Sequence, residues 1–212
     1  MRVINDRYNR ELRSFELARW MLDNEARTQT IRAWTGLSGD RVRTLARSHG
    51  SHTARAPQRH RGPSPNSLYA LLSTARARQE AAAAVGLCCL LEVFPEKRIP
   101  NARKALPGLL RGERLLTAFE ILRGVIPQTR LSLEHLVLLV LDMAGGETWK
   151  IDHCTRCHAT ILIDLLCKHP QRVCEFCEPA EESEVQEPLA LSATPATEGE
   201  AEEPWQQRRL FD

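Results

Sequence analysis

Aromatic residues and long apolar runs are both scarce in this chain of 212 residues. Phe, Trp and Tyr make up 5% of it, which tells against a protein that stacks single-stranded nucleic acid on aromatic side chains. The longest strongly apolar stretch, 131–143, is interrupted by Glu134 and His135 and is too short to cross a bilayer. Arginine and acidic residues alternate where a secretory signal would need an apolar core, so we expect a cytoplasmic protein without a membrane span.

The chain also lacks the residue patterns of common catalytic sites. We find no nucleophile paired with a base, no glycine-rich phosphate loop and no paired carboxylates at catalytic spacing. Seven cysteines in a chain expected in the cytosol argue against a disulfide framework, because thiols stay reduced there. We therefore expect a protein that is not an enzyme and whose cysteines bind a metal.

Charge is distributed unevenly along the chain. Residues 178–212 hold ten acidic and two basic residues, whereas residues 1–177 hold 17 acidic and 27 basic residues. The segment 41–79 contains eight arginines and no acidic residue. Nucleic acid, a polyanion, is a natural partner for this segment, although a solvated basic loop would have the same composition.

Apolar periodicity predicts a mainly helical chain. Besides a helix that opens at Ser38, five helices are expected, over residues 10–22, 25–34, 67–94, 111–125 and 132–143. The third is expected to be weakest at Gly86 and to bury Cys88 and Cys89 as ordinary apolar thiols. The fifth is apolar nearly all round, so it should lie in the core or at a subunit interface.

Composition divides the chain into three parts. Residues 1–147 are expected to form a helical domain that binds DNA and a partner protein. This domain includes a basic loop, 48–66, rich in Gly, Pro, Ser, His and Arg. Residues 148–178 form a small cysteine module, and the tail 179–212 is acidic and expected to be disordered.

Four cysteines of the module form two pairs. The spacing is Cys154-x2-Cys157, then sixteen residues, then Cys174-x2-Cys177. Two residues between ligands let a tight turn direct both sulfurs to one metal, so this spacing predicts a zinc ion on four thiolates. Four protein ligands leave no position for water or substrate, and we therefore expect one structural zinc per chain.

Other interpretations of the cysteine pairs remain open at this point. His158 follows Cys157, so the first pair also fits covalent haem attachment, but that would leave the second pair unexplained. A thioredoxin-like pair would need a surrounding βαβ pattern, and an iron–sulfur cluster uses the same thiolates. Neighbouring residues that could replace a ligand, but are expected to lie on the surface, are His153, His158, Cys167 and His169.

Residues 28–47 have the pattern of a helix-turn-helix segment. Gly36 permits the turn, Ser38 opens the second helix, and Val42 faces inward on that helix. Arginine on the outer face would reach phosphates or guanine edges, although such corners are also common in helical cores. The candidate DNA-binding residues on this helix and in the basic loop are Arg41, Arg43, Arg47, Arg55, Arg59 and Arg61.

The chain resembles the family of the flagellar transcriptional activator FlhC in two places. The stretches 16–18 (ELA), 25–27 (EAR) and 35–45 (TGLSGDRVRTL) are similar to the family's helix pair with its T-x-L-S-x-x-R-x-x-x-L run. The cysteine quartet is also similar, with the same sixteen-residue gap and a similar Arg172-Val173 before the second pair. The sequence departs from the family at 67–72, where members usually show an aromatic-rich stretch, and in its longer acidic tail.

This resemblance implies a transcriptional activator subunit that binds double-stranded promoter DNA and is not an enzyme. It implies a small FlhD-like partner in a hetero-oligomer, flagellar or related promoters as targets, and help in recruiting RNA polymerase. The alternative expectation is a zinc-stapled adaptor that binds other proteins and never touches DNA. Steep loss of DNA affinity with rising salt would distinguish the first from the second.

Overall fold

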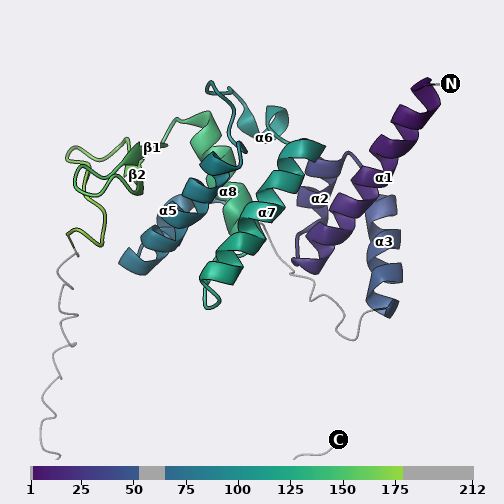
Figure 1. Cartoon of the computed structure of the whole chain (residues 1–212), viewed down its shortest axis with the longest axis horizontal. Coiled ribbons are helices and arrows are strands. Elements are labelled where there is room, and N and C mark those ends of the chain that lie inside the picture. Colours follow the sequence, from purple (N-terminus) through teal and green to yellow (C-terminus); the bar gives the residue numbers. More distant parts are fainter. Residues whose placement is uncertain (1, 53–64, 179–212) are drawn as a thin grey trace, which may run out of the picture. The chain divides into compact units, whose positions relative to one another are not determined.

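The computed structural model describes residues 2–52 and 65–178. Its helices are α1 (Arg2–Asp23), α2 (Thr28–Thr35), α3 (Gly39–His52), α4 (Leu68–Leu71), α5 (Ala75–Leu90), α6 (Ala102–Ala105), α7 (Leu109–Val125) and α8 (Leu133–Gly145). An antiparallel hairpin of β1 (Trp149–His153) and β2 (Thr160–Asp164) follows. The described part is thus mainly α-helical, as predicted (Figure 1). Four cysteines gather near its C-terminal end.

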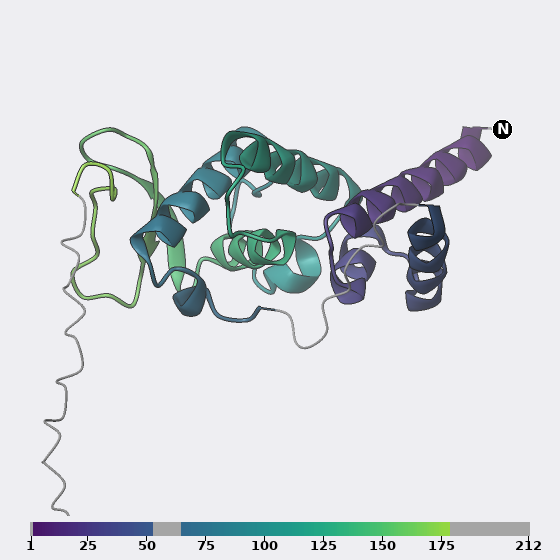
Figure 2. The same cartoon turned by 90° about the horizontal axis from the view of Figure 1, so that it is seen from below.

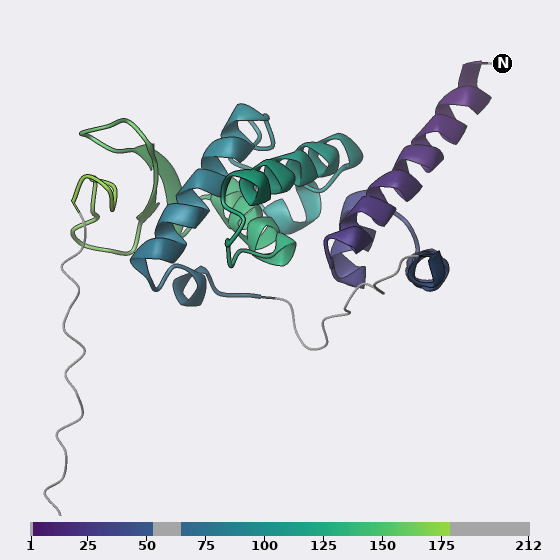
Figure 3. The same cartoon turned by 60° about the horizontal axis from the view of Figure 1, so that its bottom comes forward.

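The corner between α2 and α3 is three residues long. Gly36 adopts a left-handed conformation with φ 73°, and its N–H donates to the carbonyl oxygen of Arg32, so α2 ends where the sequence predicted. Val42, on the inner face of α3, is fully buried. Both helices pack against α1 (Figure 3). That this corner reads DNA stays a prediction, because the same geometry serves core packing in many helical proteins.

The N-terminus of α2 is held by a carboxylate from another helix. Glu134, in the first turn of α8, is buried and accepts hydrogen bonds from the Arg27 N–H (2.8 Å) and the Thr30 hydroxyl (2.9 Å). A helix N-terminus offers N–H donors and the positive end of the helix dipole, which compensate a buried negative charge. Glu134, the charged residue that interrupts the apolar stretch 131–143, therefore connects α8 to α2.

The helices α1 and α7 approach each other closely at a glycine. A Cβ atom added to Gly112 would lie 2.7 Å from the Cδ2 atom of Leu17, so a side chain there would force the core to move. Arg13 and Glu113 form an ion pair of 2.6 Å on one side of this contact. The indole N–H of Trp20 donates to Glu120 on the other. Small size at residue 112 thus sets the spacing of the two helices.

The helix α8 is the centre of the core. Of its 13 residues nine are buried, which favours the core over the alternative prediction of a subunit interface. It packs against α5 and α7, which also contact each other (Figure 2). The helix begins at the Ser132 cap and ends at Gly146, whose φ of 61° is left-handed.

The long helix predicted over 67–94 is wrong in two respects. It is divided into α4 and α5, because Ser67 and Thr74 each accept a hydrogen bond from a backbone N–H three residues later and so begin separate helices. The helix α5 runs through Gly86 without a break. Cys88 is buried as predicted, but Cys89 is exposed because it lies on the outer face of α5.

The basic loop predicted from residue 48 starts later than expected. The helix α3 continues to His52, since extending an existing helix adds one hydrogen bond per residue even through weak helix formers. Residues 53–64, which include Arg55, Arg59 and Arg61, lie outside the described residues, as does the tail 179–212. Sequence periodicity also gave no sign of the short helix α6 or of the hairpin.

The hairpin packs on the helices, with β1 against α8 and β2 against α5. The boundary expected at residue 147 between a helical domain and a cysteine module stays a prediction. Among the helices of the described ranges, none has both the length and the apolar character needed to span a bilayer.

Candidate metal centre

The first cysteine pair lies in the turn of the hairpin. The last paired residues of the ladder are His153 and Thr160, and the chain reverses between them. The Cys154 N–H donates to Ala159 O (2.8 Å) and the His158 N–H donates to Cys154 O (2.9 Å). The backbone at His158 is left-handed, with φ 60°, which closes the turn and brings Cys157 back over Cys154.

The second pair forms a similar tight turn in the segment after β2. Backbone N–H groups of Cys177 (2.9 Å) and Glu178 (3.0 Å) both donate to Cys174 O. The two turns are joined directly, because the Thr155 N–H donates to Arg172 O at 3.0 Å. Tight x2 turns at both pairs are the local structure that the spacing predicted.

The four sulfurs converge on one point. Cys154, Cys157, Cys174 and Cys177 place their Sγ atoms within 4.8 Å of one another, and the Sγ atoms of Cys157 and Cys174 are 3.5 Å apart. Four thiolates around a tetrahedral zinc ion would stand about 3.8 Å apart, given Zn–S bonds of about 2.3 Å. The residues therefore fit a four-coordinate metal ion, although their positions do not identify the metal.

Backbone N–H groups prepare the sulfurs for a cation. The N–H of Cys157, together with the N–H groups of Cys174 (3.2 Å) and Arg156 (3.4 Å), donates to Cys154 Sγ and lowers the pKa of this thiol to about 6. At Cys177 the effect is the opposite, because a hydrogen bond with the sulfur of Cys157 raises the pKa of the Cys177 thiol to about 12. A metal binds the thiolate form of cysteine, so a bound cation would displace the protons that remain on these sulfurs.

No other side chain of the described residues joins this cluster. His153, His158, Cys167 and His169 do not bring a ligand atom into the group of four sulfurs. His153 and His158 are exposed beside it, as are Cys167 and His169. The choice of the four cysteines over these neighbours agrees with the prediction from their spacing.

The candidate DNA-binding arginines of α3 differ in their surroundings. All three are exposed. Arg41 forms an ion pair with Glu11 (2.7 Å) and lies over the Phe15 ring, so it ties α3 to α1. Arg43 pairs with Asp40 on its own helix (2.5 Å). Arg47 donates to the Thr44 hydroxyl at 3.4 Å. Arg47 is therefore the one of the three for which the described residues show no ion pair.

A contact that the sequence did not predict joins the second turn to α5. Glu175 follows the ligand Cys174, is buried, and accepts a hydrogen bond from Arg78 Nε. Arg78 Nη1 also donates to Leu72 O at 3.2 Å, at the end of α4. The two residues are 97 positions apart, and nothing in either local pattern distinguishes them from surface charges.

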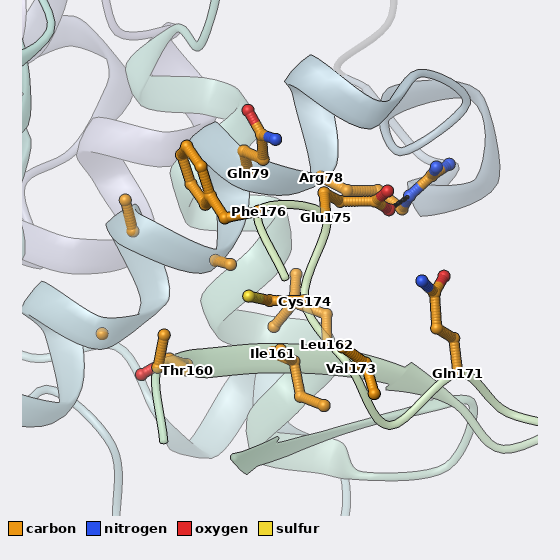
Figure 4. Close-up of a pocket in the computed structure, with 14 residues that line it drawn as sticks. Arg78, Gln79, Thr160, Ile161, Leu162, Gln171, Val173, Cys174, Glu175 and Phe176 are labelled. Carbon is orange, nitrogen blue, oxygen red and sulfur yellow. Dashed lines mark hydrogen bonds and ion pairs between the residues drawn. The ribbon is translucent and has the colours of Figure 1, made fainter. Parts of the chain in front are cut away.

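Between α5 and the cysteine turns lies a cavity of about 230 Å³ (Figure 4). Small residues of α5 form one wall, apolar residues of β2 form the floor, and the residues next to Cys174 form the opposite wall. Arg78 and Glu175 meet at its edge (Figure 4).

Comparison with known proteins does not assign this site. No protein-family model matches the chain, and no curated protein is significantly similar to it. The resemblance to the FlhC family therefore stays a prediction from the quoted residues.

Proposed function

We propose that the four thiolates hold one structural zinc ion per chain. Four sulfur ligands in tetrahedral reach are the donor set that zinc takes in structural sites, and such a closed set leaves no open position for chemistry. The observation that supports this is the group of four Sγ atoms within 4.8 Å. When bound, the ion would displace the thiol protons and hold the two turns together.

Elemental analysis tests this proposal directly. Protein purified without added metal should contain about one equivalent of zinc and show no visible absorbance. Iron with a charge-transfer band in the visible range, or less than about half an equivalent of zinc, would contradict it.

We propose further that the chain is a cytoplasmic DNA-binding subunit of a transcriptional activator and not an enzyme. The observation that supports DNA binding is the outer face of α3, where Arg43 and Arg47 are exposed one helical turn apart while Val42 is buried on the inner face. A helix fixed in this way can enter the major groove with its arginines toward the bases. The resemblance to the FlhC family adds a small FlhD-like partner, flagellar or related promoters and RNA polymerase.

The ion pairs of α3 refine which arginine would contact DNA. Arg41 pairs with Glu11 and packs on Phe15, so moving it to DNA would break contacts within the protein. Arg43 would have to leave Asp40 to contact DNA, but both side chains are exposed, and an ion pair on such a surface contributes only about 0–1 kcal/mol. Arg47 would lose one weak hydrogen bond, so we expect it to contribute most.

Alanine substitutions should separate these roles. We expect Arg47→Ala to lower affinity for cognate promoter DNA in the presence of the partner, and to reduce the slope of log K against log salt by about one per lost phosphate contact. The double variant with Arg43→Ala and Arg47→Ala should also discriminate less between cognate and scrambled duplexes. The loop set Arg55, Arg59 and Arg61 should weaken both duplexes alike.

The control for this titration is Arg103→Ala, an exposed arginine on α6. It removes the same charge away from α3 and should leave the salt slope unchanged. If variants of both sets bind DNA as the parent does, with zinc and partner retained, the DNA-reading surface lies elsewhere on the chain. If the parent itself shows no specific, salt-dependent DNA binding, the chain is the zinc-stapled adaptor instead.

A further inference from the structure

The cavity beside the metal centre has apolar walls from three parts of the chain. Ala82, Ala83 and Gly86 of α5 face Ile161 and Leu162 of β2, and Val173 closes the side next to Cys174. Small side chains on α5 leave this space open, since a larger residue at any of these positions would project toward β2. At Gly86 an added Cβ would lie 3.1 Å from the Thr160 hydroxyl oxygen.

Phe176 extends the apolar surface beyond the cavity. It lies between the ligands Cys174 and Cys177, yet its side chain is 79% exposed at the rim (Figure 4). An exposed aromatic ring next to a concave apolar surface is typical of the places where proteins bind one another. An occupant that only filled the cavity would leave this ring in water.

Glu175 supplies the polar feature of the cavity. Its Oε1 accepts from Arg78, but its Oε2 is buried and has no hydrogen-bond partner among the described residues. A buried carboxylate oxygen without a donor is costly, on the order of 1–3 kcal/mol. A ligand that brings an N–H donor or a positive charge to this edge would remove that cost.

The size of the cavity favours a side chain over a separate small molecule. Pockets for small-molecule ligands are usually about 300–1000 Å³, whereas this cavity is about 230 Å³. One large apolar side chain of a peptide would fill it, the peptide backbone would cover Phe176, and a neighbouring Lys or Arg would reach Glu175.

We propose that this cavity binds a segment of a partner protein through one large apolar side chain adjacent to a Lys or Arg, and that the site depends on the bound metal. The dependence follows from the wall next to Cys174, because Val173, Glu175 and Phe176 are ordered by the turn that the metal would hold. This interaction goes beyond DNA binding and needs no nucleic acid.

A displayed random heptapeptide library tests the proposal, with the full zinc-loaded chain as the target. Enriched peptides should carry Leu, Phe or Trp within three positions of Lys or Arg. Their affinity, measured by fluorescence anisotropy without DNA, should fall at least tenfold for Ala83→Trp, which fills the cavity from an exposed position. Ala82→Leu provides a second, smaller filling change at the same wall.

Matched variants separate each contribution. Ala105→Trp makes the same change at an exposed alanine of α6 and should bind peptide as the parent does. Glu175→Gln should retain the preference for apolar residues but lose the preference for Lys or Arg, whereas Glu178→Gln, at an exposed position beside Cys177, should lose neither. Removing the metal with a chelator should abolish binding.

Zinc content is measured for every variant, so loss of the metal centre is not mistaken for loss of the peptide site. No enrichment of the apolar and basic pattern, or equal binding by the parent and Ala83→Trp, would overturn the proposal. So would chemical fragments that bind at Ala83 while no peptide does, which would assign the cavity to a small molecule. Peptide binding by the zinc-loaded parent chain, together with no specific DNA binding by that same chain, would leave this inference standing without the DNA-binding proposal.

Discussion

Some of the important single residues in this protein can be recognised from the sequence, and others cannot. The clustering of the four cysteines was predictable, because paired x2 spacing suits the reach of two sulfurs around one metal. Glu175 and Glu134 were not, since each is defined by a partner about a hundred positions away. A lone Glu in a sequence reads as solvated charge until its surroundings are known.

The metal centre gives the sharpest prediction at this scale. Cys174→Ser removes one of four ligands, and because metal binding in such modules is coupled to folding, zinc should be lost and the segment from about 153 to 178 should become sensitive to protease. Cys88→Ala should retain the zinc, since Cys88 is buried in α5, far along the chain from the cluster. Zinc content and limited proteolysis of the two proteins provide the comparison. Zinc lost from Cys88→Ala and kept by Cys174→Ser would show the ligand assignment to be wrong.

Glu80 links the acid stability of the protein to one buried carboxylate. Burial alone would raise the pKa of Glu80, but hydrogen bonds from Arg76 (2.8 Å), the Thr129 hydroxyl (2.8 Å) and the Arg130 N–H (3.1 Å) outweigh it, so the pKa is lowered. A lowered pKa in the folded state contributes stability above the pKa of the unfolded chain, and this contribution is lost as pH falls through the folded value.

We therefore expect Glu80→Gln to lower the free energy of unfolding by about 2 kcal/mol at neutral pH. The difference from the parent should shrink as the solution is acidified below the ordinary range of a glutamate, about pH 4. Urea unfolding of both proteins across this pH range measures it, with the exposed Glu147→Gln as the control. A difference that stays constant with pH would mean that the charge of Glu80 does not matter.

At the scale of elements, the apolar segments bounded by Gly, Pro or Ser were predicted as helices, but the break set by local caps was not. The positions of α7 and α8 follow the predicted ranges closely. The break between α4 and α5 depends on two hydroxyl caps within an Ala- and Leu-rich run, which periodicity does not register. The hairpin is missed for a related reason, because its short strands flank ligand turns and are stabilised by the module around them.

The close approach of α1 and α7 predicts opposite effects for one substitution at two glycines of the same helix. Gly112→Ala should destabilise the protein by about 1–3 kcal/mol, because its methyl group would collide with the buried Leu17. Gly124→Ala, exposed near the end of α7 with nothing within 4 Å of the added Cβ, should stabilise it by about 0.5–1 kcal/mol. Thermal unfolding of the two variants tests the pair. Equal effects would mean that residue 112 does not set the helix spacing.

At the scale of the whole molecule, the residues described bring two surfaces of different chemistry into one protein. The outer face of α3 offers exposed arginines, and the edge of the metal module offers an apolar cavity with a buried carboxylate. These surfaces suit different kinds of partner, a polyanion and an apolar, basic peptide. Charge asymmetry in the sequence predicted the first surface only, since a cavity arises from packing and has no signature in composition.

The contacts that tie the N-terminal helices to the rest of the chain also set a delay during synthesis. Arg13 meets Glu113 and the Arg27 N–H meets Glu134, so the partners are 100 and 107 residues apart. A ribosome adds roughly 5–20 residues per second, which makes α1 and α2 wait for roughly 5–20 s before α7 and α8 exist. During that interval Leu17, Met21 and Trp34, buried in the finished protein, are exposed on the nascent chain. Fragments that end before residue 109 should therefore be held by chaperones or degraded.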